Sequence, residues 1–206
     1  MSYLLRIDTS PRDADSQSRA LADRLEPHIL QAHGLSRVMR VDVAERNLPH
    51  IAQDTITGFY TPPEAMTPKL EGATALSDAL IAELKSAGAL LISAPIYNFS
   101  LPSSLKAWVD QVVRIGHTFS YDGQNFGGLL PADHAYLALA YGSAGYEPGG
   151  PMRAMDHLEP YLRDLMTFLG IGSVEAFRIQ GTTGEPDAVS AAQARLANDI
   201  ATHFAA

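Results

Sequence analysis

The segment from Thr9 to Ser18 gathers side chains of the kind that hold an anion. It carries the hydroxyls of Ser10, Ser16 and Ser18. Arg12 adds a guanidinium, and the segment leads into a stretch with helical spacing of apolar residues. The first N–H groups of a helix are unpaired and attract negative charge, so hydroxyls beside them suit a phosphate. A second interpretation stays open, in which Ser16 and Ser18 are only helix caps.

Two later loops contain groups that suit a flat ligand. Pro95–Ser100 (PIYNFS) follows a continuous apolar run and carries two aromatic residues, Tyr97 and Phe99. Aromatic side chains and free backbone groups at a strand end suit a heteroaromatic ring; alternatively, the two rings only close the end of the sheet. Tyr141–Gly145 (YGSAG) follows the next apolar run, and its glycines let the backbone approach a ligand closely, unless the segment is an ordinary turn.

The composition excludes several kinds of chemistry. The 206-residue chain has no cysteine, which excludes disulfides, thiolate metal sites, iron–sulfur clusters and a cysteine nucleophile. P-loop, GxGxxG, GxSxG and HExxH patterns do not occur, so we expect neither a dinucleotide fold of that kind, a serine hydrolase nor a metal site. The net charge of −8 argues against nucleic acid or an anionic membrane as a partner. Without a signal peptide or a membrane span, a soluble cytoplasmic protein is expected.

Short apolar runs alternate with amphipathic stretches along the chain. The runs that we expect to form strands are residues 3–9, 38–43, 89–94, 135–140 and 174–179. Helical spacing follows each of them, over about 18–33, 68–84, 102–112, 158–169 and 189–204. This alternation predicts a single α/β domain over residues 1–206, with a parallel sheet covered by helices on both faces.

Prolines and glycines mark the expected breaks in these elements. Pro27 lies inside the first helix and is expected to kink or shorten it, and Pro160 is expected to mark the start of the fourth. The segment Asn47–Thr67 has no periodicity and three prolines, which predicts a long functional loop. The pair Asp122–Gly123 predicts the turn of a small β-ribbon over residues 118–130.

The chemically interesting loops are expected to meet. In an open α/β sheet, ligands bind beyond the carboxyl ends of the strands, where the strand order reverses. The loops that begin at Thr9, Pro95 and Tyr141 follow the first, third and fourth predicted strands. We therefore expect the ligand site among these three loops.

Three segments, taken together and in order, resemble one known family: TSPRDADSQSRALA, PIYNFSLPSSLKAWVDQVVRIGHTFSY and PYLRDLMTFLGI. Over nearly its whole length the chain resembles the FMN-dependent NADH:azoreductases and NAD(P)H quinone reductases. The resemblance implies a flavodoxin-like fold of three layers, with five parallel strands in the order 2-1-3-4-5. It also implies a homodimer with one tightly, non-covalently bound FMN per subunit near the dimer interface, and NADH or NADPH as the electron donor.

The resemblance also implies which residues bind the cofactor. Those expected to hold the FMN phosphate are Ser10, Ser16, Gln17 and Ser18. Those expected along the isoalloxazine ring are Pro95, Ile96, Tyr97, Asn98 and Phe99. Those expected at its pyrimidine edge are Tyr141, Gly142 and Ser143.

The substrate pocket is implied in the same way. Tyr121 matches a family aromatic residue that lines this pocket, across the dimer interface, and Phe99 is a further candidate. Tyr60 stands where some members carry an arginine near the substrate. The segment Ala140–Ser143 departs from the Ser-Arg-Gly-Gly that members often carry, so the choice of nicotinamide and of substrate stays open.

The activity that the resemblance implies is a two-electron reduction of quinones, to hydroquinones, and of azo compounds. NAD(P)H gives hydride to FMN, and the acceptor then uses the same ring face, so the kinetics are expected to be ping-pong. No side chain is expected to act as an acid, a base or a nucleophile. The alternatives are a flavodoxin-type electron carrier, which binds FMN but does not oxidise nicotinamide, and a flavin-free interaction module.

Overall fold

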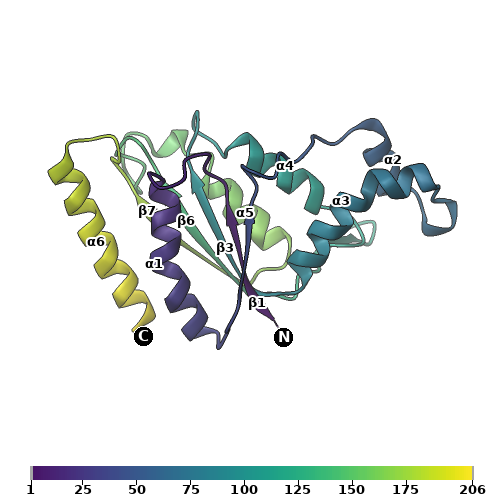
Figure 1. Ribbon diagram of the computed structural model, residues 1–206, viewed down its shortest axis with the longest axis horizontal. Helices are drawn as coiled ribbons and strands as arrows, with labels where there is room; N and C mark the ends of the chain where they lie inside the picture. Colours follow the sequence, from purple (N-terminus) through teal and green to yellow (C-terminus); the bar gives the residue numbers. More distant parts are fainter. Residues whose placement is uncertain (1, 206) are drawn as a thin grey trace.

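Five parallel strands form the central sheet of the computed structural model, which describes residues 2–205 (Figure 1). They are β1 (Tyr3–Asp8), β2 (Val38–Asp42), β3 (Ala87–Pro95), β6 (His134–Ala140) and β7 (Ser173–Ile179). A separate ribbon holds β4 (Phe119–Tyr121) and β5 (Phe126–Gly128). The order of strands in the sheet is β2-β1-β3-β6-β7. Because the ribbon takes the numbers 4 and 5, β6 and β7 are the fourth and fifth strands of the sheet, so this is the predicted order 2-1-3-4-5 and it confirms the flavodoxin-like arrangement.

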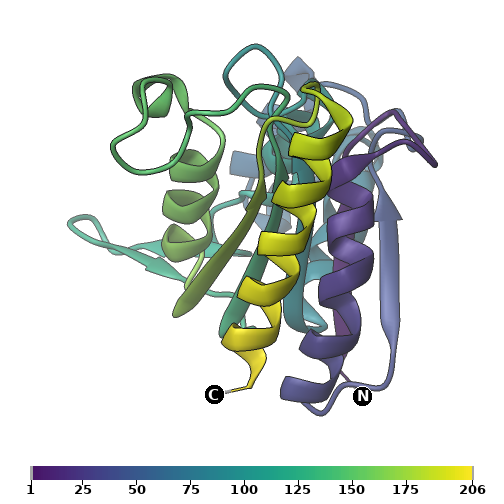
Figure 2. The ribbon, with the colours of Figure 1, turned by 90° about the vertical axis from the view of Figure 1, so that its left-hand side faces the viewer.

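Helices cover both faces of this sheet. On one face α1 (Gln17–Ala32) and α6 (Pro186–Phe204) lie side by side (Figure 2), and on the other lie α3 (Pro68–Lys85), α4 (Ser103–Val112) and α5 (Glu159–Phe168). Alternate strand residues enter the two cores: Leu4 packs with α1 and α6, whereas Leu5 belongs to the core with α3, α4 and α5. Burial on both faces explains why the strands are continuous apolar runs. Between residues 2 and 205, none of the helices is long and apolar enough to cross a membrane.

Pro27 does not shorten α1, so the predicted shortening is wrong, and the alternative of a kink stays a prediction. The helix continues through Gln17–Ala32, because Leu25 and Ile29, on either side of the proline, are buried against the sheet. Packing of an apolar face therefore outweighs the hydrogen bond that a proline removes. Pro160 lies in the first turn of α5, where a missing N–H has no cost, as predicted.

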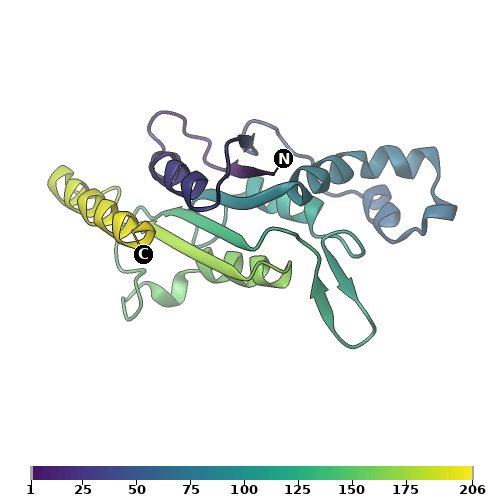
Figure 3. The ribbon, with the colours of Figure 1, turned by 90° about the horizontal axis from the view of Figure 1, so that it is seen from below.

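The segment Asn47–Thr67 is not a continuous loop, which corrects a second expectation. It contains α2 (Gln53–Tyr60) and the short helix η1 (Pro63–Ala65). With the start of α3, it projects beyond the sheet (Figures 1 and 3). α2 lies against α3 at Gly58, where an added Cβ would stand 2.5 Å from Thr74 Cγ2. This close contact between helices stabilises α2, which is too short to be stable alone.

The predicted β-ribbon is confirmed. β4 and β5 pair antiparallel, and the Asp122 carboxylate accepts the N–H groups of Gln124 and Asn125 in the turn. The ribbon extends away from the sheet (Figure 3). At Gly128 an added Cβ would lie 2.1 Å from the backbone N of Gly170, so the two backbones touch directly. Because Gly170 lies between α5 and the start of β7, the ribbon is attached at the amino edge of the sheet.

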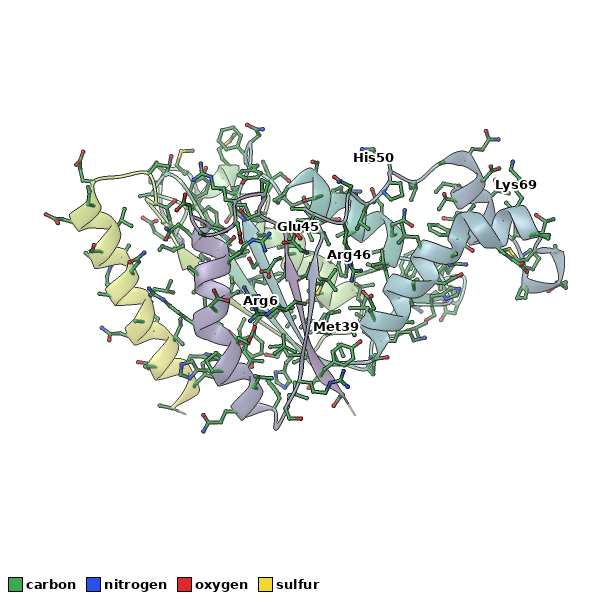
Figure 4. The ribbon with its side chains drawn as sticks, in the orientation of Figure 1. Arg6, Met39, Glu45, Arg46, His50 and Lys69 are labelled. Carbon is green, nitrogen blue, oxygen red and sulfur yellow. The ribbon has the colours of Figure 1, made fainter. Side chains whose placement is uncertain are left out.

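Arg6 is a buried charge between the sheet and α1 (Figure 4). Only 2% of the residue is exposed, and its guanidinium lies 3.0 Å from Asp8, 2.5 Å from Asp23 and 3.0 Å from Glu26. Because α1 supplies Asp23 and Glu26, these ion pairs connect α1 to β1. A buried charge with all its partners is tolerated, whereas a buried charge that loses a partner is strongly destabilising.

Replacing Arg6 leaves the buried carboxylate of Asp8 with only the 3.8 Å contact to Arg19. We expect Arg6→Met to lower the free energy of unfolding, measured by urea denaturation, by about 3 kcal/mol. Arg40→Met is the matched control, since Arg40 also pairs with Glu26 but has 57% of its side chain exposed. We expect the control to lose less than about 1 kcal/mol. Equal losses in the two variants would contradict the role of Arg6.

His33, at the end of α1, generates a prediction about pH. Burial lowers the pKa of His33, and the neighbouring ring of His134 lowers it further. The Nε2 atom of His33 lies 2.8 Å from the hydroxyl oxygen of Tyr136. Folding therefore favours the neutral ring. Its contribution to stability is present above about pH 6.5, the unfolded-state pKa, and is lost as the pH falls from there through the lower pKa of the folded state.

We expect His33→Gln, which cannot become charged, to lose less stability than the wild type between about pH 7.5 and about pH 5.5. The measurement is the urea midpoint at each pH. His50→Gln makes the same substitution at an exposed histidine (Figure 4) and is the control for it. A His33→Gln variant with the pH dependence of the wild type would show that His33 does not contribute to it.

Candidate functional site

Several loops lie close together at the carboxyl edge of the sheet (Figure 2). Residues of these loops line one cleft. The loops that follow β1, β3 and β6 contribute to it, as expected, and the loop after β7 completes it. The predicted cofactor residues that line the cleft are Ser10, Ser16, Gln17, Ser18, Pro95, Ile96, Tyr97 and Gly142. The structure therefore brings together residues that are far apart in the sequence.

The loop after β1 places buried hydroxyls at the amino end of α1. Ser10, Ser16 and Ser18 are all buried, and Ser16 Oγ accepts the Arg19 N–H as the helix cap. Ser18 lies in the first turn, with its Oγ 3.3 Å from that of Ser16. The two interpretations of these serines are therefore compatible, because Ser16 caps the helix and also borders the cleft.

Charged and polar side chains complete this wall of the cleft. Arg12 and Asp15 carry opposite charges there, so much of the attraction for an anion comes from the amino terminus of α1. The Gln17 side chain accepts a hydrogen bond from Gln193 of α6 at 3.2 Å, which fixes it beside the cleft. Among residues 2–205, no three histidine, aspartate or glutamate side chains gather as ligands of a metal ion would.

The loop after β3 holds two aromatic side chains on a strained backbone. Asn98 and Phe99 have φ angles of 47° and 70°, in the left-handed region that residues with side chains rarely adopt. Reciprocal backbone hydrogen bonds between Tyr97 and Ser100 close the loop, and the His157 N–H donates to the Phe99 carbonyl at 2.9 Å. Strain that the surroundings hold in place is typical of functional loops.

The exposure of the two rings distinguishes between their interpretations. Tyr97 is 39% exposed and Phe99 is 41% exposed. Rings that only closed the end of the sheet would be buried, so this exposure favours a contact face for a flat ligand. Asn98 and Phe99 do not line the cleft themselves but lie in the same loop, next to Tyr97.

The loop after β6 is held by the loop after β7. The N–H groups of Thr182 and Thr183 donate to the carbonyls of Tyr141 and Gly142 at 3.2 and 3.1 Å, and the threonine hydroxyls donate to the same carbonyls. Within residues 2–205, the N–H groups of Gly142 and Ser143 donate to no other protein group. These two donors therefore remain available to a ligand.

Some residues of the cleft are not predicted from the sequence. Thr182 and Thr183 line it, as do Asp15 and Ala140. The available signal was the run Gly181–Gly184 (GTTG), which directly follows the fifth strand and so emerges at the same edge of the sheet. Two hydroxyl residues between glycines are typical of a loop that approaches a ligand.

Three predicted tyrosines lie outside the cleft. Tyr141 is fully buried, and its hydroxyl donates to Asp156 at 3.1 Å. Tyr60 is exposed at the end of α2, and Tyr121 is exposed on the ribbon, its ring 4.6 Å from that of Phe126. Neither Tyr60 nor Tyr121 reaches the cleft of its own chain. Their place in a substrate pocket stays a prediction, and it requires that they reach the cleft of a second copy of this chain.

The curated relatives of this chain are named as redox enzymes. The chain is 49% identical to an FMN-dependent NADH:quinone oxidoreductase of Xanthobacter autotrophicus, over 85% of this chain and 84% of that protein. It is 38% identical to FMN-dependent NAD(P)H:quinone oxidoreductase 1 of Pseudomonas aeruginosa, over 88% of each protein.

Solved structures and a family model agree on the fold. An azoreductase from Bacillus anthracis strain Sterne matches with a TM-score of 0.87 at 23% identity, over 99% of each chain. An FMN-dependent NADH-azoreductase from another strain of that species, solved with FMN, matches with a TM-score of 0.82 at 21% identity, over 98% of this chain and 100% of that one. A family model described as the flavodoxin-like fold matches residues 2–204. The chain therefore belongs to the flavodoxin-like family.

Proposed function

We propose that this protein is an FMN-dependent NAD(P)H oxidoreductase that reduces quinones to hydroquinones and also reduces azo compounds. One observation carries the proposal: buried serine hydroxyls at a helix amino terminus and an exposed aromatic loop border the same cleft. The names of the relatives at 49% and 38% identity support the activity. In this proposal residues 1–206 form one FMN-binding domain.

The residues of the cleft fit FMN. A phosphate needs several donors near positive charge, and the three buried serines, the amino terminus of α1 and Arg12 offer them. A flat ring needs an apolar face with donors at its polar edge. Tyr97 in the cleft, with Phe99 beside it in the same loop, offers the first. The N–H group of Gly142 in the cleft, with that of the adjacent Ser143, offers the second.

When bound, FMN would supply the two-electron chemistry between NADH or NADPH and the acceptor. The role of the protein is to bind and orient. The N–H groups of Gly142 and Ser143, with those of Asn98 and Phe99, would stabilise negative charge at the polar edge of the ring, as oxyanion-hole donors do. Donor and acceptor would use the open side of the cleft in turn, which makes the kinetics ping-pong. No side chain is assigned as an acid, a base or a nucleophile.

The proposal extends to a homodimer that acts in the cytoplasm. Exposed aromatic residues on the two projections support the dimer, because Tyr60, Tyr121 and Phe126 leave apolar surface in water. In the dimer, the ribbon or α2 of one copy would complete the substrate pocket of the other. An enclosed pocket of this kind favours an enzyme over a flavodoxin-type electron carrier, which would also bind FMN.

Anaerobic reduction separates these two functions. We expect the purified protein, given FMN, to bind one FMN per chain and turn yellow. NADH or NADPH is expected to bleach the visible flavin absorption, and a quinone added afterwards to restore it. An electron carrier would keep its colour with NAD(P)H alone. Protein that takes up no FMN would overturn the proposal.

Ser18→Ala tests how the phosphate is held. The loss of one hydrogen bond to a charged group, worth about 1.5–3 kcal/mol, is expected to raise the Kd for FMN about 10- to 100-fold. Ser86→Ala is the control, because it removes a hydroxyl that bonds to Ala82 at the far end of α3. Ser18→Ala protein with the FMN affinity of this control would contradict the phosphate assignment.

Substitutions at Asn98 test the strained loop. Glycine adopts a φ of 47° freely, whereas the β-branched valine does not. We expect the apo form of Asn98→Val to be less stable than that of Asn98→Gly by about 1–2 kcal/mol in urea denaturation, and to bind FMN more weakly. Equal stability of the two variants would mean that the left-handed conformation is not required.

A further inference from the structure

We infer that Tyr141 is a positioning residue for the cofactor cleft, which holds the loop after β6 in place relative to the loop after β3 by way of Asp156. The inference rests on the proposed function for its ligand, FMN. It also accounts for the direction of the Tyr141 side chain, which turns away from the cleft.

Tyr141 stands where the chain leaves β6 for the cleft. Its N–H donates to the Ile179 carbonyl at 2.8 Å, which extends the pairing of β6 with β7 by one residue. Its ring is fully buried in the core that α5 covers, 4.8 Å from the ring of Tyr146. Its hydroxyl donates to Asp156 Oδ2 at 3.1 Å. The backbone of Tyr141 therefore begins the cofactor loop, while its side chain anchors that loop in the core.

Asp156 is held by donors on both carboxylate oxygens. Its side chain is fully buried, and Oδ1 accepts the N–H groups of Leu158 and Glu159, each at 3.1 Å. Oδ2 accepts the Tyr141 hydroxyl and the Arg153 guanidinium, each at 3.1 Å. A buried carboxylate with four donors has a well-defined position and is a firm anchor for the tyrosine.

The next residue connects this anchor to the second loop. The N–H of His157 donates to the carbonyl of Phe99 at 2.9 Å, so the same turn holds the strained loop after β3. A series of contacts runs from Gly142 through Tyr141, Asp156 and His157 to Phe99. It sets the separation between the N–H groups of Asn98 and Phe99 and those of Gly142 and Ser143, which the proposed function assigns to the flavin ring.

The hydrogen bond has a fixed direction. Burial, and then the carboxylates of Asp156 and Glu159, raise the pKa of the Tyr141 phenol, so the phenol stays protonated and donates at neutral pH. Phenylalanine would fill nearly the same volume and leave Asp156 without one donor. Tyr141→Phe therefore removes the hydrogen bond and keeps the packing.

We expect apo protein with Tyr141→Phe to bind FMN about 5- to 20-fold more weakly than the wild type, from quenching of FMN fluorescence. We also expect the visible spectrum of the bound flavin to change, because its polar edge meets displaced donors. Tyr146→Phe is the matched control, because the ring of Tyr146 packs against that of Tyr141 in the same core. This variant also removes a tyrosine hydroxyl, but not the one that bonds to Asp156. It is expected to retain wild-type affinity and spectrum.

A double-mutant cycle tests whether the effect passes through Asp156. Asp156→Asn is expected to weaken FMN binding at least as much as Tyr141→Phe, and the double variant to bind no more weakly than Asp156→Asn alone. Hydrogen–deuterium exchange on the apo protein gives a readout without cofactor. Exchange of the hydrogen-bonded N–H groups at this loop, those of Tyr141, Thr182 and Thr183, is expected to accelerate in Tyr141→Phe and to stay unchanged in Tyr146→Phe.

The outcomes separate this inference from the proposed function. Wild-type protein that binds no FMN would overturn the proposed function, and the exchange measurement would still test the Tyr141 contact. If the wild type binds FMN but Tyr141→Phe matches it in affinity and in exchange, the positioning role is wrong. Additive losses in the cycle would also overturn it, because they would show that the two side chains act independently.

Discussion

Burial of the sheet on both faces is the constraint from which the position of the cleft follows. α1 and α6 on one side, and α3, α4 and α5 on the other, cover the strands along their length. Irregular backbone in such a core would carry unpaired polar groups. Free N–H groups therefore occur where strands end, and parallel strands end together at one edge. The cleft combines these unpaired donors with the rigid support of the strands below them.

That support allows the loop after β3 to keep an unfavourable conformation. Left-handed backbone at two successive residues with side chains, Asn98 and Phe99, costs about 1–3 kcal/mol each. The loop keeps it because Tyr97 and Ser100 close it and His157 holds its end. Apolar burial in the cores on the two faces of the sheet offsets this cost. Packing away from the cleft thus allows strain at the cleft.

The sequence predicts those features that depend on local pattern. The strands and the Asp122 turn follow from apolar runs and turn residues, and the meeting of the loops follows from the parallel order. α2 is not predictable in this way, because it depends on the contact of Gly58 with Thr74 of α3. The spacing of apolar residues in the sequence does not indicate such a contact. The inward direction of Tyr141 is equally hidden, because it depends on a contact with Asp156, 15 residues later, that no local pattern predicts. The apolar spacing of Leu25 and Ile29 across Pro27 is visible in the sequence, but the degree of their burial, which keeps α1 unbroken, is not.

The direct contact between the backbones of Gly128 and Gly170 has an evolutionary consequence. Together with the packing of Phe119 and Phe126 on Phe168 of α5, it sets the direction of the ribbon. Substitutions in the turn at the tip of the ribbon leave this attachment in place, so the tip can diverge among descendants independently of the loops at the opposite edge of the sheet. A methyl group at Gly128 would collide with the backbone of Gly170, and at Gly170 the φ of 102° disfavours any side chain. We expect divergence to spare these two positions even where every neighbouring side chain has been exchanged.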